Sequence, residues 1–547
     1  MYQKVDNFFS RYEFLLPLII FVLFLAASLP GIEWGAPALW NPDELVWRVN
    51  SALRSELIFD ETEPDWNYPS LPKYIMYAIG SITFGMGKSD FAFVVASRIF
   101  SAFLGALSGV VIYYLTKMLG ANKRISFLAG LFYIASGVAV ANGRFAHNDL
   151  YLQLFSILCV FFAVKYQKTK QMTWLFASFF SVGLAASSKY TGGSLILLPA
   201  FIFIFEKWTD LRSNWFYVFR SLFAGAIVSY LGYSLGTPKA LFAPIYYFSS
   251  VIPALQNYTQ YGFNSGARIG LFGQWAVFES AVGIFCYYAF ILAFLWFFMR
   301  LILWKKDEGK FEHIMPQGIG TLLLAVLIFD LPFMISINYI QRYFIPFVPF
   351  LAILAALFVD EILLFTTKKK LTFIQPLFVV ILIAGFSYSA LRLVSTALLF
   401  INDSRIPATE YIATIRGYQK SIEYTLYPPN LDKRRFERAH NYPIYFVKYP
   451  NDVVPTGGRY EYNQGEQGLL ERDTDYFVID SYTYQRFYVD SICETNPIEC
   501  DFFKRLIAGE VESFRLIQKF EYNLPSYLPR VTVSAVNPDI LIFERVR

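Results

Sequence analysis

The chain has 547 residues, of which 56% are hydrophobic, 19% aromatic and only 16% charged. An ordinary soluble domain carries about 25% charged residues, so this composition excludes a purely soluble protein and indicates a membrane protein. The net charge of +5 is small and gives no reason to expect a nucleic-acid partner.

About eleven apolar stretches approach the roughly 20 residues that a helix needs to cross a bilayer. Short basic loops follow the second, fourth, eighth and tenth of them, and a cytoplasmic N-terminus puts all four loops on the cytoplasmic side, as the positive-inside rule requires. The first stretch is interpreted as a retained anchor. The stretches cover residues 14–30, 91–116, 124–142, 149–166, 172–188, 191–206, 217–235, 276–302, 317–337, 343–364 and 373–400.

The opposite face then carries the first outer loop, 31–90, and everything after residue 401. In this loop acids alternate with tryptophans, which predicts short helices lying in the membrane interface; the acids include Asp60, Glu61, Glu63 and Asp65. After residue 401 the composition becomes that of a soluble protein, with strand-like runs. We therefore expect a transmembrane domain over 1–400 and a small soluble extracytoplasmic α/β domain over 401–547.

Cys493 and Cys500 flank a short turn-rich stretch of the C-terminal domain. A local disulfide is expected if this face is oxidising, and two free thiols are the alternative.

The acidic pair Asp43-Glu44 follows Trp40-Asn41-Pro42 in the first outer loop. One carboxylate is suited to act as a general base that takes a proton from an acceptor hydroxyl. The alternative is helix capping by Asn41, with acids in the first turn. Both interpretations are compatible with each other.

Asp149 closes the polar turn 144–149 between the third and fourth stretches, and this turn falls on the same face. Asn148 or Asp149 capping the fourth span is the alternative to a catalytic role. His147 is one of only three histidines. It is a candidate metal ligand, although an interfacial histidine is more often simply hydrogen-bonded.

Three cations, Lys73, Lys189 and Arg342, also fall on the acidic face, where topology requires no positive charge. They are candidates for holding a lipid phosphate. Snorkelling to lipid headgroups is the alternative.

Taken in chain order, these motifs resemble the GT-C membrane glycosyltransferases, specifically the superfamily of protein O-mannosyltransferases and aminoarabinose transferases. The resemblance covers roughly residues 10–365. It departs from the family at Tyr68-Pro69-Ser70, where a histidine or lysine before two prolines is frequent. The motifs are the acidic pair Asp43-Glu44, the Pro-containing stretch Tyr68 to Tyr74, Arg98, the Arg-Phe-Ala-x-x-Asp stretch from Arg144 to Asp149, the Lys-Tyr-Thr-Gly turn at Lys189 and the Arg-Tyr-x-x-Pro turn at Arg342.

The resemblance implies a GT-C fold and an inverting transfer of a sugar from a polyprenyl-phosphate donor to an acceptor hydroxyl at the outer membrane face. It implies Asp43 as base, Glu44 or Asp149 in support of the base or the acceptor, and phosphate binding by Lys189, Arg342, Lys73 and Arg144. A divalent ion at Asp43, Glu44 and His147 is not required by the spacing. Neither the sugar nor the acceptor, whether protein, lipid or glycan, can be read from the sequence.

A transporter or flippase for an amphipathic lipid is the alternative function. Asp330, which lies within an apolar stretch beside Pro332, is the feature that favours it, because ionisable residues inside spans often mark transport pathways. The chain has no recognisable C-terminal ER-retention signal, which favours a prokaryotic plasma membrane.

Overall fold

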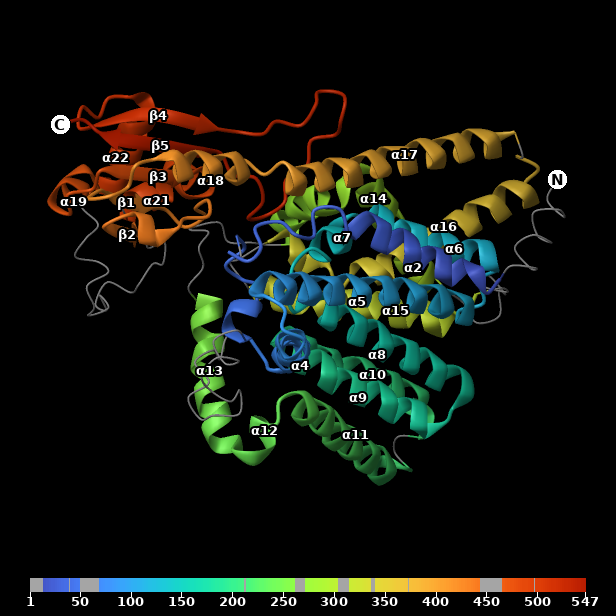
Figure 1. Cartoon of the computed structure of the whole chain (residues 1–547). Coiled ribbons are helices and arrows are strands. Elements are labelled where there is room, and N and C mark those ends of the chain that lie inside the picture. Colours follow the sequence, from blue (N-terminus) through green and yellow to red (C-terminus); the bar gives the residue numbers. More distant parts are fainter. Residues whose placement is uncertain are drawn as a thin grey trace.

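A computed structural model describes residues 13–38, 40–49, 68–210, 213–260, 271–303, 314–335, 340–371, 373–442, 465–495 and 497–547. In these ranges the chain forms a bundle of apolar helices followed by a small domain built on a five-stranded sheet (Figure 1). The predicted fold class, an α-helical membrane protein with a C-terminal α/β domain, is confirmed.

Six of the described helices are long and apolar enough to cross a membrane. They are α5 (Asp90–Met118), α8 (Asp149–Thr169), α11 (Trp215–Gly236), α14 (Leu271–Ile302), α16 (Val348–Lys368) and α17 (Ile374–Ile401). The shorter apolar helices are α2 (Leu15–Ser28), α9 (Met172–Ser188), α10 (Leu197–Glu206) with the preceding 3-10 turn η1 (Tyr190–Ile196), and α15 (Pro316–Ile335). The count of about eleven crossings therefore stays a prediction.

Two of the predicted spans are interrupted at glycines. The stretch 124–142 is split into α6 (Lys123–Ala135) and α7 (Val138–Asn142) by Gly137, whose φ is +75°. Inside α14, Gly283 has φ +78° and ψ 153°, a conformation that only glycine adopts readily. Hydropathy alone does not reveal these breaks, because glycine scarcely changes the apolar character of a stretch.

The helices run back and forth, so that the basic loops gather at one end of the bundle. Lys123 Nζ lies 2.5 Å from Glu13 Oε2, and Lys117 pairs with the same carboxylate. The Met315 N–H donates to Leu119 O at 2.9 Å, which brings the start of α15 to the end of α5. Figure 1 shows the sheet domain beyond the opposite end of the bundle.

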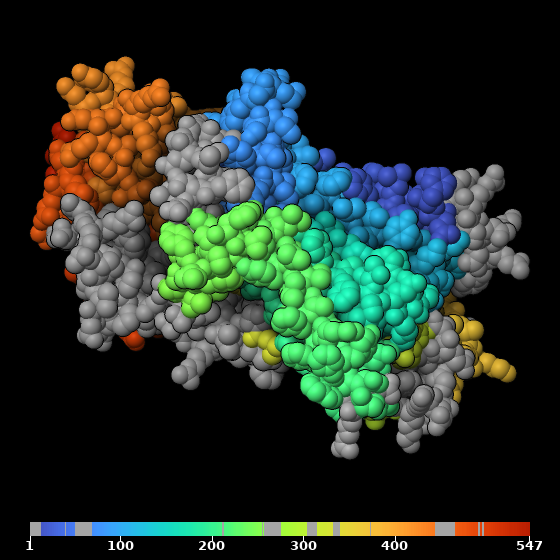
Figure 2. Space-filling model, turned by 90° about the horizontal axis from the view of Figure 1, so that it is seen from below, coloured from blue at the N-terminus to red at the C-terminus, as the bar shows by residue number. Residues whose placement is uncertain are grey.

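Three helices do not follow the direction of the bundle. They are α4 (Leu71–Gly85), α12 (Lys239–Phe242) and α13 (Pro244–Gln260). Figure 1 shows α4 along its axis, across the direction of α5 and α8. Figure 2 shows α12 and α13 in green on the surface, where Phe242 is 83% and Ile245 87% exposed. Such exposed apolar side chains suit a membrane interface.

The outer domain has the sheet order β2-β1-β3-β5-β4. Strands β1, β2 and β3 are parallel, and β5 runs antiparallel to both β3 and β4. Alternate residues of β3 enter different cores: Phe477 packs with Phe503 of α22, and Val478 packs with Ile412 of α18. Both faces of the sheet are therefore covered.

The strands are β1 (Ser421–Tyr424), β2 (Arg438–Asn441), β3 (Tyr476–Asp480), β4 (Phe514–Phe520) and β5 (Ile540–Arg545). The helices of this domain are α18 (Arg405–Thr414), α19 (Gly465–Glu471), α20 (Ser481–Tyr484), α21 (Asp490–Thr495) and α22 (Pro497–Ala508), with the 3-10 turns η5 (Lys433–Arg435) and η6 (Gln485–Tyr488). Cys493 and Cys500 form a disulfide, with their Cα atoms 5.4 Å apart.

A buried network joins the outer domain to the first outer loop. Asp403 and Arg405 are both fully buried and paired, with Arg405 Nη2 2.8 Å from Asp403 Oδ2. The Arg405 guanidinium lies 5.0 Å from the ring of Trp34 and 4.5 Å from that of Trp40. Trp34 Nε1 also donates to Asp403 Oδ2 at 2.8 Å. Because these charges are buried and mutually satisfied, the network fixes the domain firmly to the loop.

The interruption of α14 gives a first prediction. Gly283→Ala forces a Cβ atom into a glycine-only conformation and to within 1.7 Å of Arg392 Nη1, so we expect a loss of roughly 1–3 kcal/mol in unfolding free energy. Thermal unfolding in detergent checks this. Gly320→Ala in α15 is the matched control, because its nearest outside neighbour is Leu301 Cδ2 at 3.6 Å; an equal loss in both variants would contradict the prediction.

Candidate functional site

The site is assembled by a buried ion pair between two distant parts of the chain. Arg98 of α5 and Glu44 are both fully buried, and Arg98 donates to Glu44 from Nε at 2.8 Å and from Nη2 at 2.7 Å. Arg98 Nη1 donates to the carbonyls of Ile32 and Trp34. Glu44 Oε1 also accepts from the Ala146 N–H at 2.8 Å. The acidic pair is thereby held against the polar turn 144–149.

Asp43, next to Glu44, faces Arg342. Its Oδ2 accepts from Arg342 Nη2 at 2.7 Å, and its side chain is 40% exposed. Burial alone would raise the pKa of Asp43, but the charges of Arg342 and His147 hold it below its usual range. Asp43 is therefore an ionised carboxylate within reach of solvent.

Asp149 lies on the other side of the same guanidinium. Its Oδ2 is 3.8 Å from Arg342 Nε, and its Oδ1 accepts from Lys189 Nζ at 2.7 Å. Arg342 belongs to the 3-10 turn η4 (Gln341–Phe344). The structure therefore brings together the two acids and the two cations, Asp43, Asp149, Lys189 and Arg342, from four separate segments.

His147 completes this group. Its Nδ1 lies 2.8 Å from Asp149 Oδ2, and its side chain is 2% exposed. Burial, reinforced by Arg342 and Lys189 and opposed by Asp149, lowers the pKa of His147. A carboxylate only accepts, so Nδ1 is the donor in this contact. Among the described residues no partner binds Nε2 of His147.

The alternative of helix capping has different outcomes at Asp43 and at Asp149. Asn41 Oδ1 accepts from the Asp43 N–H at 3.1 Å, so Asn41 does stabilise the turn that presents Asp43. Helix α8 begins at Asp149, but Asn148 makes no side-chain capping hydrogen bond; its Nδ2 donates to Ser188 O at 3.0 Å. The Asn148 side chain therefore links the polar turn to the end of α9 and does not cap α8.

Two predicted site residues have no access to substrate. Glu44 is occupied by Arg98 and the Ala146 N–H, as described above. The Arg144 guanidinium is fully buried and donates to Pro30 O at 2.7 Å and Ala27 O at 2.6 Å. Because backbone carbonyls accept hydrogen bonds from its guanidinium, Arg144 does not make the predicted contact with a donor phosphate in this geometry. Glu44 and Arg144 therefore hold the neighbouring segments of the chain in place.

A hydroxyl cluster joins the segments that carry Lys189, Lys73 and Lys239. Thr237 Oγ1 lies 2.7 Å from Ser187 Oγ and accepts from the Ser70 N–H at 3.4 Å. Lys189, Lys73 and Lys239 follow these three residues by two or three positions, and Lys73 and Lys239 are 3% and 7% exposed. Sequence reasoning missed Lys239. The signal was available, because it too is a basic residue on the face where topology requires none.

No group of three or more His, Cys, Asp or Glu side chains suited to a metal ion occurs in the part of the chain that the structure describes. Asp43, Glu44 and His147 are therefore not gathered as a ligand set. The loop acids Asp60, Glu61, Glu63 and Asp65 lie outside the described residues.

Comparison with known proteins supports the expected family. Residues 72–248, about a third of the chain, match the family model of dolichyl-phosphate-mannose-protein mannosyltransferases. The yeast protein dolichyl-phosphate-mannose–protein mannosyltransferase 1 of Saccharomyces cerevisiae is 22% identical over 253 residues, which are 43% of this chain and 30% of that protein. The chain therefore matches less than a third of that relative. The resemblance to the protein O-mannosyltransferase superfamily is confirmed over the matched segment.

Solved structures give more distant likenesses. The structure of ArnT from Cupriavidus metallidurans bound to undecaprenyl phosphate is 13% identical with a TM-score of 0.47, covering 97% of this chain and 98% of that one. The apo oligosaccharyltransferase of Archaeoglobus fulgidus is 11% identical with a TM-score of 0.49, covering 94% and 75%. Likenesses at this level carry no conclusion about substrates.

The buried pair gives the second prediction. Glu44→Gln leaves the Arg98 guanidinium buried without its counter-charge, so we expect a loss of roughly 3–5 kcal/mol in unfolding free energy. Thermal unfolding in detergent measures it. Asp43→Asn, one residue away on a part-exposed side chain, is expected to change stability by less than about 1 kcal/mol. Equal melting temperatures for Glu44→Gln and wild type would contradict the structural role.

Proposed function

We propose that the chain is a glycosyltransferase that moves a sugar from a polyprenyl-phosphate donor to an acceptor hydroxyl at the outer membrane face. The observation that carries this is the meeting of an ionised, part-exposed Asp43 with Arg342, beside Asp149 and Lys189. The family match over residues 72–248 supports it. The extracytoplasmic placement of this face follows from the basic loops at the opposite end.

Asp43 is the proposed general base. The acceptor oxygen attacks the anomeric carbon of the sugar while the bond from that carbon to the phosphate oxygen breaks, and Asp43 takes the hydroxyl proton. Attack from the face opposite the leaving phosphate inverts the configuration. Polyprenyl phosphate leaves with the bonding electron pair, and phosphate needs no strong general acid.

The cations have the complementary task. Negative charge grows on the departing phosphate, and fixed cations in a partly desolvated site stabilise it at that moment. Arg342 and Lys189 are the nearest cations to Asp43 and Asp149. Lys73 of α4 and Lys239 of α12 add positive charge on segments that are hydrogen-bonded to the segment of Lys189. Asp149 positions Lys189 and His147 between turnovers.

An apolar groove supports a lipid-linked donor. It lies between α14, α15 and α16, and Phe344 of η4, the turn that carries Arg342, is among its lining residues. Its lining is almost entirely apolar and includes Phe278, Phe290, Phe294 and Phe347. An apolar surface of this kind favours a prenyl chain.

The transporter alternative rests on two observed features. Asp330 lines this groove, and α14 is interrupted at Gly283; ionisable residues within spans and broken helices are both typical of transporters. The alternative predicts movement of intact donor across the bilayer without cleavage, so release of polyprenyl phosphate separates the two functions.

The third prediction tests the base. Asp43→Asn cannot accept the proton, so we expect transfer to fall by about 10²- to 10⁴-fold, the usual contribution of general base catalysis. Transfer is measured as loss of label from polyprenyl-phosphate [¹⁴C]mannose, and then from other polyprenyl-phosphate sugars, in proteoliposomes with membrane extract as acceptor. Glu410→Gln, an exposed acid on α18, is the control. Undiminished transfer by Asp43→Asn overturns the base assignment.

The fourth prediction concerns pH. Arg342 lowers the pKa of Asp43, so the wild-type base stays ionised, and kcat/KM is maintained, as the pH falls toward the acid range. In Arg342→Gln this support is lost while burial remains. We expect the acid limb of the kcat/KM profile to move to higher pH and the donor KM to rise. An unchanged acid limb would show that Arg342 does not act on the titrating group.

A further inference from the structure

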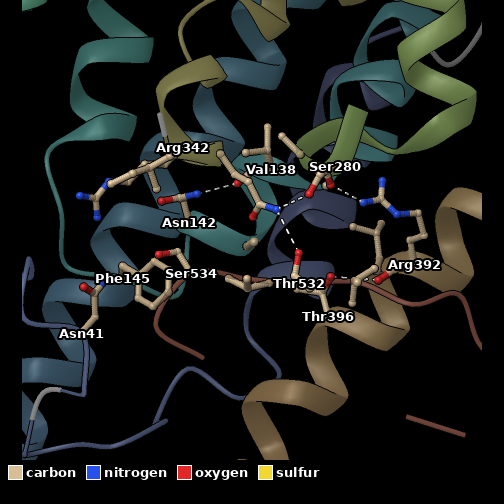
Figure 3. Close-up of a pocket in the computed structure, with 18 residues that line it drawn as sticks. Asn41, Val138, Asn142, Phe145, Ser280, Arg342, Arg392, Thr396, Thr532 and Ser534 are labelled. Atoms are coloured by element: carbon tan, nitrogen blue, oxygen red, sulfur yellow. Dashed lines mark hydrogen bonds between the residues drawn. The ribbon is translucent and has the colours of Figure 1, made fainter. Parts of the chain in front are cut away.

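Arg342 and its neighbour Gln341 point in different directions from η4. A 3-10 helix has three residues per turn, so successive side chains leave it about 120° apart. Arg342 reaches Asp43 and Asp149, as described above. It lines a small cavity together with Ser280 and Thr532, and Figure 3 shows its guanidinium pointing away from these two residues.

Gln341 also lines that cavity. Its Nε2 donates to Ser280 Oγ at 2.5 Å and to Thr532 Oγ1 at 3.2 Å (Figure 3). Ser280 belongs to α14, whereas Thr532 belongs to the segment of the outer domain that precedes β5. One amide group therefore joins a membrane helix, the turn that carries Arg342 and the outer domain.

Both partners of Gln341 are themselves fixed. The carbonyl of Ser280 lies just before the interruption at Gly283 and accepts from Arg392 Nη2 of α17 at 2.9 Å. The segment of Thr532 is held by the Tyr482 hydroxyl, which donates to Val533 O at 3.0 Å and Val536 O at 2.7 Å. Gln341 therefore connects two anchored points, and η4 lies between them.

The cavity is too small to bind a sugar. Its volume of about 40 Å³ has room for only a few water molecules. The hydrogen bonds of Gln341 are thus not explained by a ligand in the cavity. What they fix is the rotation of η4 about its own axis, and with it the direction in which Arg342 leaves the turn.

The outer domain also contacts the segment that carries Asp43. Trp40, three residues before Asp43, donates from Nε1 to Asn430 Oδ1 at 2.7 Å. In the same loop after β1, burial raises the pKa of Tyr427, with the charges of Asp480 and Asp43 adding to this and Arg486 opposing it. The Tyr427 and Tyr482 rings are in edge contact at 5.5 Å. The domain that holds Thr532 is therefore continuous with the surroundings of the proposed base.

We propose that Gln341 is a positioning residue through which the outer domain fixes Arg342 for the donor phosphate. The proposal rests on the proposed function, because it gives Arg342 its task. It also assigns a role to the outer domain, which holds one side of the phosphate-binding turn in place by way of Thr532.

Gln341→Met tests this, because it keeps the length of the side chain and removes both donors. We expect kcat/KM for the donor to fall about tenfold, the change that follows from losing two ordinary hydrogen bonds, with a higher donor KM and a lower kcat, because Arg342 contacts the phosphate both when it is bound and when it leaves. The acid limb of the kcat/KM profile is expected to move to higher pH, because a displaced Arg342 lowers the pKa of Asp43 less. Binding of unlabelled polyprenyl phosphate, followed by competition with the labelled donor, is expected to weaken in parallel.

Thr532→Val and Ser280→Ala each remove one of the two acceptors, so each is expected to raise the donor KM about threefold. Neither is expected to add to the effect of Gln341→Met, because the three groups form one network. Thr396→Val is the control: Thr396 lines the same cavity, but its hydroxyl donates to Arg392 O within α17. It is expected to leave the donor KM and the pH profile unchanged.

The outcomes separate this inference from the proposed function. Wild-type donor KM and pH profile in folded Gln341→Met and Thr532→Val, with activity lost in Asp43→Asn, would overturn the positioning role alone. Full activity of Asp43→Asn would overturn the proposed base. If Gln341→Met does not fold, Thr532→Val decides, because the outer-domain side of the link is changed while Gln341 keeps its bond to Ser280.

Discussion

The pairing of Glu44 with Arg98 is the constraint on which the rest of the site depends. It is fully buried, bidentate and completed by the Ala146 N–H and two backbone carbonyls. A buried pair of this kind adds little net stability relative to apolar residues, but losing one partner is costly. The pair contributes to specificity. It holds the segment of Glu44 in one position against the turn 144–149, and in that position Asp43 lies on the same side as Asp149.

A single guanidinium then balances the two acids. Arg342 contacts Asp43 directly and lies near Asp149, whose second partner is Lys189. The local charges are therefore nearly compensated before any substrate arrives. Under the proposed function, an incoming lipid phosphate competes with the carboxylates for the same cations, and the carboxylate that it displaces most readily is the part-exposed Asp43, which is the group proposed to take the proton.

The sequence was sufficient for features that depend on composition and alternation. Apolar stretches predicted the helices to within a few residues, and the alternating basic loops predicted that residues such as Asp149 and Arg342, nearly 200 positions apart, share one end of the bundle. The interruptions at Gly137 and Gly283 escaped prediction because glycine is compatible with a membrane helix. The bonds of Arg144 and Gln341 escaped it because their partners are distant backbone carbonyls or hydroxyls, which no local pattern marks. The sequence marked Glu44 as a candidate that supports the base or the acceptor, but it did not predict that the side chain is buried against Arg98.

The junction between the outer domain and the first loop has a consequence for the order of folding. Arg405 donates to Ala535 O, and Asn537 donates its N–H to Asp403, so the walls around Trp34 and Trp40 include residues that are synthesised long after those tryptophans. A nascent chain can therefore insert its helices early and still lack these walls. Completion of this junction is a late, long-range event that waits for synthesis of the segment before β5.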